Sequence, residues 1–108
     1  MLVYMKNTVN NDSLHGWEDE DSKTVFQAVL KLRSLKECED FFRDLMTLHE
    51  IREMAERFRI ARMLDRHMPY LEIADQAETS TTTVTRVAHW LKHGRGGYRL
   101  VLDRLRKS

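Results

Sequence analysis

The sequence of 108 residues has little of several features that define common protein classes. It contains one cysteine, Cys38, and one proline. A single cysteine excludes a disulfide framework and is typical of a reducing compartment, so we expect a cytoplasmic protein. No apolar run approaches the roughly 18 residues of a membrane span, and the N-terminus lacks the basic and apolar pattern of a leader peptide. These absences predict one soluble domain with no membrane partner.

The motifs of common catalytic sites are also missing. There is no phosphate-binding P-loop, no glycine pattern of a dinucleotide-binding fold and no nucleophile elbow. His89 and His93 stand four residues apart, but no cysteine or carboxylate pair with metal-ligand spacing accompanies them. We therefore expect no enzyme activity, no metal site and no cofactor.

The charges are distributed unevenly, although the formal net charge is only +1. Residues 1–24 carry two basic and five acidic side chains, and residues 25–65 carry eight of each. Residues 66–108 carry eight basic and four acidic side chains, so the C-terminal third is the positive end of the chain. Such an asymmetry indicates an acidic partner, of which nucleic acid is the commonest.

The chain is expected to consist of an arm and a helical domain. Residues 1–21 mix polar residues with an acidic run and lack periodicity, which predicts a mobile acidic arm. Over residues 22–108 apolar residues recur at helical spacing, and no segment reads as a strand, so the predicted fold is all-α. Six helices are expected, at about residues 22–33, 35–45, 50–66, 70–77, 81–93 and 98–106.

Cap signals and apolar stripes define these helices further. Ser22 is the expected N-cap of the first helix, and Ser34 and Thr47 each precede a glutamate by three residues, the spacing of a capping box. The third helix should be the longest, at about five turns. Its predicted core stripe consists of Ile51, Met54, Ala55, Phe58, Ala61 and Leu64. The last helix is expected to place Tyr98, Val101, Leu102 and Leu105 on one side.

Residues 70–93 have the pattern of a helix-turn-helix, in which a short helix, a turn of about four residues and a second helix follow one another. Ala74 is small where the two helices would cross, and Ile73 and Val84 would fill the space between them. The second helix then presents its other face to solvent. Its polar residues there are Thr81, Thr82, Thr85, Arg86 and His89, with Thr83 at the border and Lys92 and His93 further along.

Short hydroxyl side chains near a helix N-terminus are suited to the major groove of DNA. Threonine can donate to or accept from base edges and contact a thymine methyl, while Arg86 can reach guanine or phosphate. The alternative is that these threonines only cap a helix and solvate its face. Five threonines among residues 79–85 oppose helix stability, because β-branching restricts their rotamers. This choice of residues favours DNA recognition.

Several strings of this sequence occur together in a known family. They are Arg57-Phe58-Arg59-Ile60, Glu72-Ile73-Ala74, the run from Ser80 to Val87, and Gly97-Tyr98-Arg99-Leu100-Val101-Leu102-Asp103-Arg104-Leu105. Through them, about residues 23–106 resemble the Trp-repressor-like family, specifically its YerC/YecD branch. The resemblance implies a six-helix fold in which two chains intertwine as a homodimer and each presents a helix-turn-helix to duplex DNA. The implied DNA-facing residues are Thr79, Ser80, Thr81, Thr82, Thr83, Thr85 and Arg86, to which the helical pattern adds His89 and Lys92.

Two positions depart from the pattern of that family. The turn position usually occupied by glycine is Glu78, where a strained or altered turn would place a carboxylate toward DNA phosphates. Arg57 and Arg86 match the two arginines with which the Trp repressor holds its amino-acid corepressor, but the small residue after the second arginine is Val87. The resemblance therefore implies a candidate effector site at these arginines. We do not expect tryptophan as its ligand, and a different small effector is left open.

The function expected from these observations is that of a bacterial transcriptional regulator, which binds specific duplex DNA as a homodimer. The alternative is an all-helical interaction module whose helix-turn-helix docks a protein partner, which Glu78 and the near-zero net charge favour. An enzyme acting on nucleic acid is the third candidate. It is disfavoured because no carboxylate cluster near the basic end would hold Mg²⁺.

Overall fold

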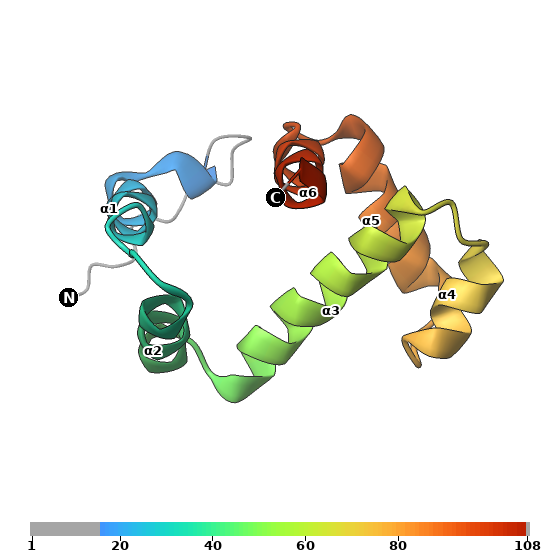
Figure 1. Cartoon of the computed structure of the whole chain (residues 1–108), viewed down its shortest axis with the longest axis horizontal. Coiled ribbons are helices and arrows are strands. Elements are labelled where there is room, and N and C mark those ends of the chain that lie inside the picture. The colour runs from blue at the N-terminus through green and yellow to red at the C-terminus, as the bar shows by residue number, and fades with distance from the viewer. Residues whose placement is uncertain (1–15, 108) are drawn as a thin grey trace. The chain divides into compact units, whose positions relative to one another are not determined.

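The computed structural model describes residues 16–107 and shows only helices there (Figure 1). This confirms the all-α prediction and the six α-helices. A short 3₁₀ turn, η2 (Gly16–Glu18), precedes α1 (Glu20–Val29), α2 (Leu35–Leu45), α3 (Leu48–Asp65), α4 (Tyr70–Gln76), α5 (Thr81–His93) and α6 (Gly97–Lys107). Two compact units make up the chain, Met1–Leu45 and Met46–Ser108. We call them the N-terminal and C-terminal units; most of the predicted acidic arm lies outside the described residues.

Helix α1 begins earlier than the sequence pattern predicted. Its N-cap is Asp19 rather than Ser22, because the Asp19 carboxylate accepts the Ser22 N–H at 2.8 Å. That hydrogen bond lowers the pKa of Asp19 below its usual value. The helix ends at Val29 rather than near residue 33. The acidic run therefore starts a helix, where its negative charge complements the helix dipole.

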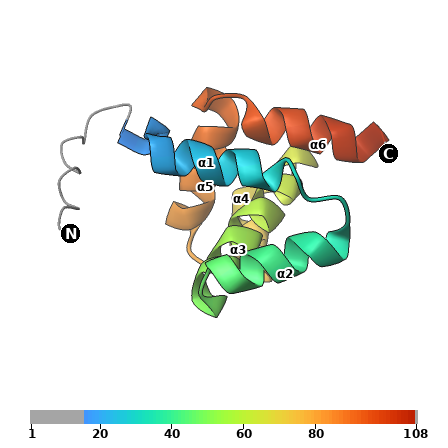
Figure 2. The same cartoon turned by 90° about the vertical axis from the view of Figure 1, so that its left-hand side faces the viewer.

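Helix α2 begins with a variant of the predicted capping box. The Glu37 N–H donates to Ser34 Oγ at 3.1 Å as expected, but the Glu37 carboxylate accepts the Arg33 N–H instead of that of Ser34. Figure 2 shows α1 and α2 as two separate rods connected by residues 30–34. Within residues 16–45 no side chain is buried, and the Trp17 and Phe26 rings contact each other edge to face at 6.3 Å.

Helix α3 has the predicted capping box and length. The Thr47 N–H donates to the Glu50 carboxylate at 2.9 Å, and the Glu50 N–H donates to Thr47 Oγ1 at 3.1 Å. The predicted core stripe is wrong in part, since only the C-terminal half of the helix is buried. Its buried residues are Ile60, Ala61 and Met63, whereas Ile51, Phe58 and Leu64 are half-buried and Met54 and Ala55 are exposed.

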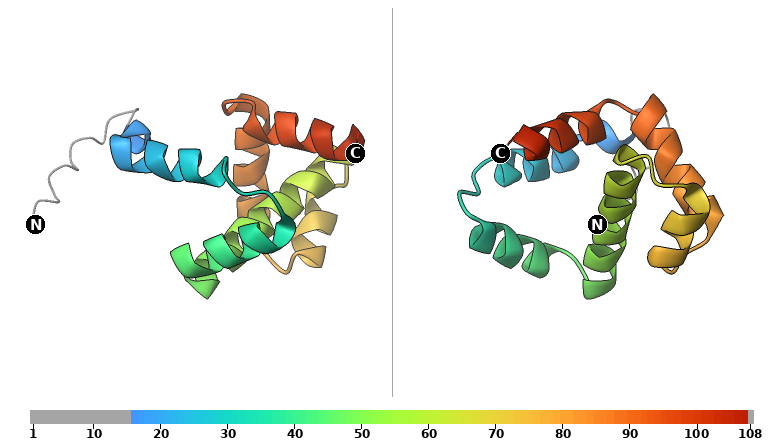
Figure 3. Two further views of the ribbon diagram at one scale, coloured as in Figure 1. Left: turned by 60° about the vertical axis from the view of Figure 1, so that its left-hand side comes forward. Right: turned by 45° about the vertical axis from the view of Figure 1, so that its right-hand side comes forward.

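The core of the C-terminal unit lies where α3, α4 and α5 meet. Ile60, Ile73 and Val84, one from each helix, are completely buried. Figure 3 shows α4 and α5 side by side, and each also contacts α3. Ala74 is buried at this crossing, as its small size predicted. The helix-turn-helix is thus held by a core of its own, to which Val87 from α5 also contributes.

Two left-handed residues end α3 and α4 in the same way. His67 has φ 63° and Glu78 has φ 54°. After α3, the His67 N–H donates to the Leu64 carbonyl at 2.9 Å and the Met68 N–H to the Met63 carbonyl at 3.2 Å. After α4, the Glu78 N–H donates to the Asp75 carbonyl at 3.2 Å and the Thr79 N–H to the Ala74 carbonyl at 2.9 Å. This is the Schellman arrangement, which usually places glycine at the left-handed position. The predicted strained turn at Glu78 is confirmed.

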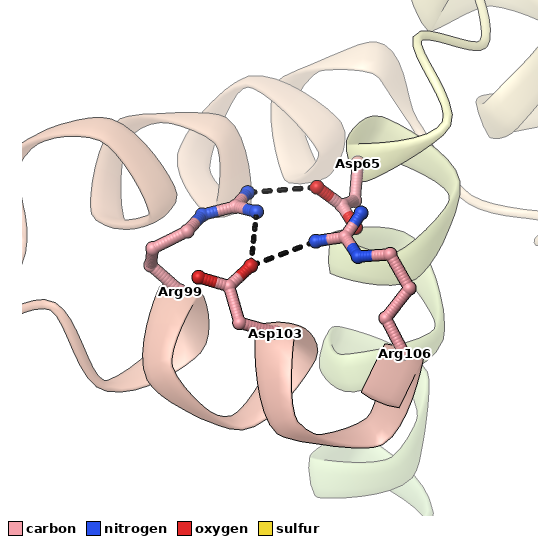
Figure 4. A network of polar contacts seen from close by, with 4 residues as sticks. All are labelled: Asp65, Arg99, Asp103 and Arg106. Carbon is pink, nitrogen blue, oxygen red and sulfur yellow. Dashed lines mark hydrogen bonds and ion pairs between the residues drawn. The ribbon is translucent and has the colours of Figure 1, made fainter. Parts of the chain in front are cut away.

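Helix α6 is attached to the end of α3 by ion pairs rather than by a wide apolar face. The predicted apolar side is wrong in part, since only Leu102 is buried, while Val101 and Leu105 are exposed. Asp65 forms ion pairs with Arg99 at 2.8 Å and with Arg106 at 3.2 Å, and Asp103 forms ion pairs with the same two arginines (Figure 4). Both carboxylates are thereby shared between the same two guanidinium groups.

Candidate nucleic-acid interface

The N-terminus of α5 is built by a hydroxyl cap. Ser80 is its N-cap, and Ser80 Oγ accepts the Thr83 N–H at 3.2 Å. The two hydroxyl groups also share a hydrogen bond of 3.2 Å. Two of the predicted DNA-facing residues therefore serve the start of the helix. Thr79, another of them, is half-buried and belongs to the turn after α4.

The opposite sides of α5 separate core from solvent. Val84, Val87 and Ala88 are buried on one side. The other side carries the remaining predicted DNA-facing residues, all of them exposed: Thr81, Thr82, Thr85, Arg86, His89 and Lys92. Because these side chains share one helix face beginning at its N-terminus, the structure brings them together as the helical spacing predicted. This face therefore carries hydroxyl, imidazole and cationic groups.

An aromatic side chain that the sequence analysis did not single out adjoins this surface. Trp90 is 56% exposed, and its ring contacts that of His89 edge to face at 4.9 Å. His89 and His93 lie 5.3 Å apart between ring centroids. Within residues 16–107 no group of three or more metal-ligating side chains gathers. Trp90 follows Arg86 by four residues on α5, and this spacing was the signal in the sequence that the two lie on the same side of the helix.

Arg57 and Arg86, predicted as an effector pair, line one cavity of about 540 Å³. They come from α3 and α5, and Val87 lies beside them in the wall. The cavity also contains residues that the sequence analysis missed, namely Glu53, Glu56, Thr83, Trp90 and Tyr98. Glu53 additionally pairs with His49 at 3.2 Å. Two guanidinium and two carboxylate groups therefore face one space that has aromatic walls.

Two of the cations of the basic C-terminal third, Arg99 and Arg106, are engaged by the ion pairs with Asp65 and Asp103. The hydrogen bond from Arg99 lowers the pKa of Asp65 below its usual value, and the hydrogen bond from Arg106 lowers that of Asp103. Since two carboxylates balance two guanidinium groups, this cluster adds no net charge. Arg86 and Lys92, by contrast, form no ion pair that the described part of the chain shows.

The fold and this surface define an all-α protein with a helix-turn-helix formed by α4 and α5. The second helix of this motif, α5, exposes a polar, cationic face. Residues 20–106 match the family model of the Trp repressor protein, and the chain belongs to the Trp repressor family. That family consists of regulators rather than enzymes. In keeping with the absence of an apolar run in the sequence, no helix between residues 16 and 107 is suited to crossing a membrane.

Relatives of known sequence or structure agree with this assignment. The uncharacterised protein YerC of Bacillus subtilis is 37% identical over 97 residues, which is 90% of each chain. A TrpR-like protein from Eubacterium eligens superposes with a TM-score of 0.77 at 40% identity, covering 82% of this chain and 92% of the other. A protein from Staphylococcus aureus described as a candidate Trp repressor has a TM-score of 0.76 at 33% identity, covering 82% and 88%. The predicted family is confirmed.

Proposed function

We propose that this protein is a transcriptional regulator that binds specific duplex DNA through α5. The observation that carries the proposal is the division of α5 into a buried apolar side and an exposed side of hydroxyl and cationic groups. Membership of a regulator family supports it. In helix-turn-helix proteins the second helix enters the major groove and its N-terminal residues contact base edges.

The residues of the exposed face have different parts in this proposal. Thr81, Thr82 and Thr85 are close to the helix N-terminus and have short side chains, so they discriminate base pairs. Arg86 and His89 reach bases or phosphates from the next turn. Lys92 lies in the last turn and contributes phosphate attraction, which supplies affinity without sequence preference. Ser80 and Thr83 hold the helix start in place, where backbone N–H groups meet a phosphate.

The same proposal includes a homodimer. Large apolar side chains on α1 and α2 are left exposed, among them Phe26 at 55% and Leu35 at 75%. Large apolar side chains left exposed in such number on two short helices are typical of an interface between protein chains. A second copy supplies both the cover for these faces and the second helix-turn-helix that a palindromic operator requires.

An effector site at Arg57 and Arg86 completes the proposed function. Guanidinium groups bind carboxylate well, and Glu53 and Glu56 in the same cavity favour an ammonium group. The cavity is therefore suited to a small zwitterionic molecule. Val87 and the indole of Trp90 occupy space in its wall, so we do not expect a second indole there. Because Arg86 also belongs to the exposed face of α5, an effector bound to it would alter DNA affinity.

A protein-docking role is the second candidate, and one observation favours it. Glu78 is exposed in the turn that immediately precedes the proposed recognition helix. A carboxylate there repels the phosphates of a duplex that approaches α5. A protein partner with a basic surface would not meet this repulsion.

Selection of bound sites from random duplex DNA at moderate salt, with light scattering of the bound complex, distinguishes these functions. We expect enrichment of a palindromic motif by a dimer. A folded, dimeric chain that enriches no motif, with or without small zwitterions, would favour protein docking. Cleavage of the DNA that EDTA abolishes would identify an enzyme instead.

Two variants separate base contact from phosphate contact on the selected site. Thr82→Ala should lower the preference for that site by about 1 kcal/mol or more while changing binding to unrelated DNA little. Lys92→Ala should weaken binding to all sequences. It should also reduce the slope of the logarithm of the binding constant against the logarithm of the salt concentration by about one. Equal loss on all sequences from both variants would argue against these two roles.

A further inference from the structure

A second cavity, of about 570 Å³, opens at the base of the helix-turn-helix. Its walls come from the end of α3, the linker of residues 66–69, the start of α4, the later turns of α5 and the first turn of α6. It shares no residue with the cavity at Arg57 and Arg86. The volume falls within the range of roughly 300–1,000 Å³ that small-molecule sites occupy in proteins.

One part of this cavity is apolar. Leu64 and Met68 pack against the buried core on one side and line the cavity on the other. Ala88, which is buried, and Leu91, which is half-buried, complete this part from α5. Such a surface gains free energy when the apolar body of a ligand removes it from water.

The other part carries hydrogen-bond donors. His67, Tyr70 and Lys92 line the cavity, and the side chains of all three are without an ion pair or side-chain hydrogen bond to any residue in the described range 16–107. Arg99 also lines it but is engaged by Asp65 at 2.8 Å and Asp103 at 3.2 Å, while Asp65 is shared with Arg106. The charge left without a partner in the cavity is therefore the positive charge of Lys92.

We propose that this cavity is a binding site for a small amphipathic anion, a carboxylate attached to an aromatic or aliphatic body. The apolar part takes the body of the ligand, and Lys92 takes the carboxylate with help from His67 and Tyr70. An inorganic anion would leave the apolar surface wet, and a neutral molecule of the same shape would leave the Lys92 charge unused. Both should therefore bind more weakly than the amphipathic anion.

Binding at this site would oppose DNA binding. Lys92 belongs both to this cavity and to the proposed DNA face. A carboxylate bound to Lys92 would neutralise its charge, so that Lys92 would no longer attract a DNA phosphate. By linkage the anion should weaken DNA affinity, and DNA should weaken the affinity for the anion by the same factor. This consequence rests on the proposed function, whereas the binding site itself does not.

Titration of the full chain, labelled with ¹⁵N, tests the site without DNA. Benzoate is the probe, and we expect saturable shifts of the amides of residues 64–70 and 88–92 with a dissociation constant of about 1 mM, typical of so small a ligand. Benzamide and inorganic phosphate should each bind at least about fivefold more weakly. Lack of saturable shifts at these amides with benzoate, or equal binding of phosphate, would overturn the proposal.

Variants of Lys92 and His67 test whether benzoate binds at these two side chains. Lys92→Gln should weaken benzoate binding about tenfold, as expected for loss of a charge-assisted hydrogen bond. His67→Gly removes a ring donor at a left-handed position that glycine favours, so the variant should fold and bind benzoate more weakly. Glu78→Gly changes the equivalent left-handed residue outside the cavity and should leave benzoate binding unchanged. Unchanged binding in the two cavity variants would overturn the site.

A competition arm separates this inference from the proposed function. If the protein binds DNA, benzoate should reduce that affinity in the unaltered chain and have less effect on Lys92→Gln. If it binds no DNA at any salt, the amide shifts still report on the cavity, and only the opposing effect on DNA is lost. Benzoate bound at the cavity with unchanged DNA affinity would overturn the opposition and retain the site.

Discussion

The two units of this chain differ in where their apolar side chains lie. In the C-terminal unit Ile60, Ile73 and Val84 have no exposed surface. In the N-terminal unit, within residues 16–45, no side chain is buried, and Leu30 is 82% exposed. Isolated helices of 10 or 11 residues such as α1 and α2 are marginal in water. The comparison indicates that the C-terminal unit has its own core, whereas the N-terminal unit requires another surface to cover it.

The largest effect should come from the core that the C-terminal unit holds by itself. Ile73→Ala should lower the free energy of unfolding by about 2–5 kcal/mol, because it leaves a cavity between α4 and the helices around it. Urea denaturation measures this loss. Leu71→Ala on the same helix is the matched control, since Leu71 is 77% exposed, and it should change stability by less than about 0.5 kcal/mol. Similar losses in both variants would contradict the core described for α4.

A change in the N-terminal unit should act on association rather than on that core. Phe26→Asp places a charge in an exposed apolar face of α1 and should weaken the proposed homodimer at least about tenfold, the effect of altering an interface anchor. Light scattering over a dilution series measures the dissociation. Leu71→Asp adds the same charge to an exposed leucine of the C-terminal unit and should leave the dimer intact. A dimer insensitive to Phe26→Asp would place the interface elsewhere.

The ion pairs between α3 and α6 should have a moderate effect on the C-terminal unit. Asp65→Asn should cost about 1–2 kcal/mol of stability at neutral pH, since the Asp65 side chain is only 16% exposed and two guanidinium groups lose their shared carboxylate. Asp75→Asn, an exposed change of equal charge on α4, should cost much less.

The pH dependence of this difference has a definite sign. Because pairing lowers the pKa of Asp65 in the folded state, its contribution is fully present above the unfolded value of about 3.9 and is lost as the pH falls through the folded value. The stability gap between the unaltered chain and Asp65→Asn should therefore narrow when urea midpoints are measured at decreasing pH below about 4. A gap that stays constant to the acid limit would show that the charge of Asp65 is not its source.

The smallest effect on stability is expected at Glu78, one of the two residues in the left-handed conformation. Glu78→Gly should raise stability by less than about 1 kcal/mol, because the relief of the left-handed conformation exceeds the extra entropy of glycine in the unfolded chain. It should also strengthen DNA binding by removing a carboxylate beside the proposed recognition helix. Thermal denaturation and DNA titration measure the two effects, and Glu78→Gln separates them, since it removes the charge and keeps the strain. A loss of stability in Glu78→Gly would contradict the strain at this turn.

Local signals in the sequence predicted much of the C-terminal unit. Thr47 and Glu50 form the capping box that their spacing predicts, and Ile73, Ala74 and Val84 occupy the core that the helix-turn-helix pattern requires. These features depend on contacts within one helix or between two helices joined by a short turn. The exposure of Thr82 and Arg86 follows from the same periodicity, because the opposite side of α5 is buried.

Such local patterns could not predict contacts between residues that lie far apart in the sequence. The stripe through Met54 and Phe58 is as apolar as the end of α3, yet only the part against which α4, α5 and α6 pack is buried. The bond between Asp65 and Arg99 spans 34 positions of the chain, and no local spacing predicts it. The place of Trp90 in the cavity of Arg57 and Arg86 could not be predicted from local spacing either, because residues of α3 and α5 come together to form that cavity.

The sequence by itself determined the helices, their caps, the helix-turn-helix and the polar face of α5, because propensity and periodicity act over a few residues. Only the tertiary structure decided which apolar faces are buried and which cations have partners. It also decided which side chains share the two cavities. These outcomes depend on the directions in which whole helices pack, which no single segment of the chain specifies.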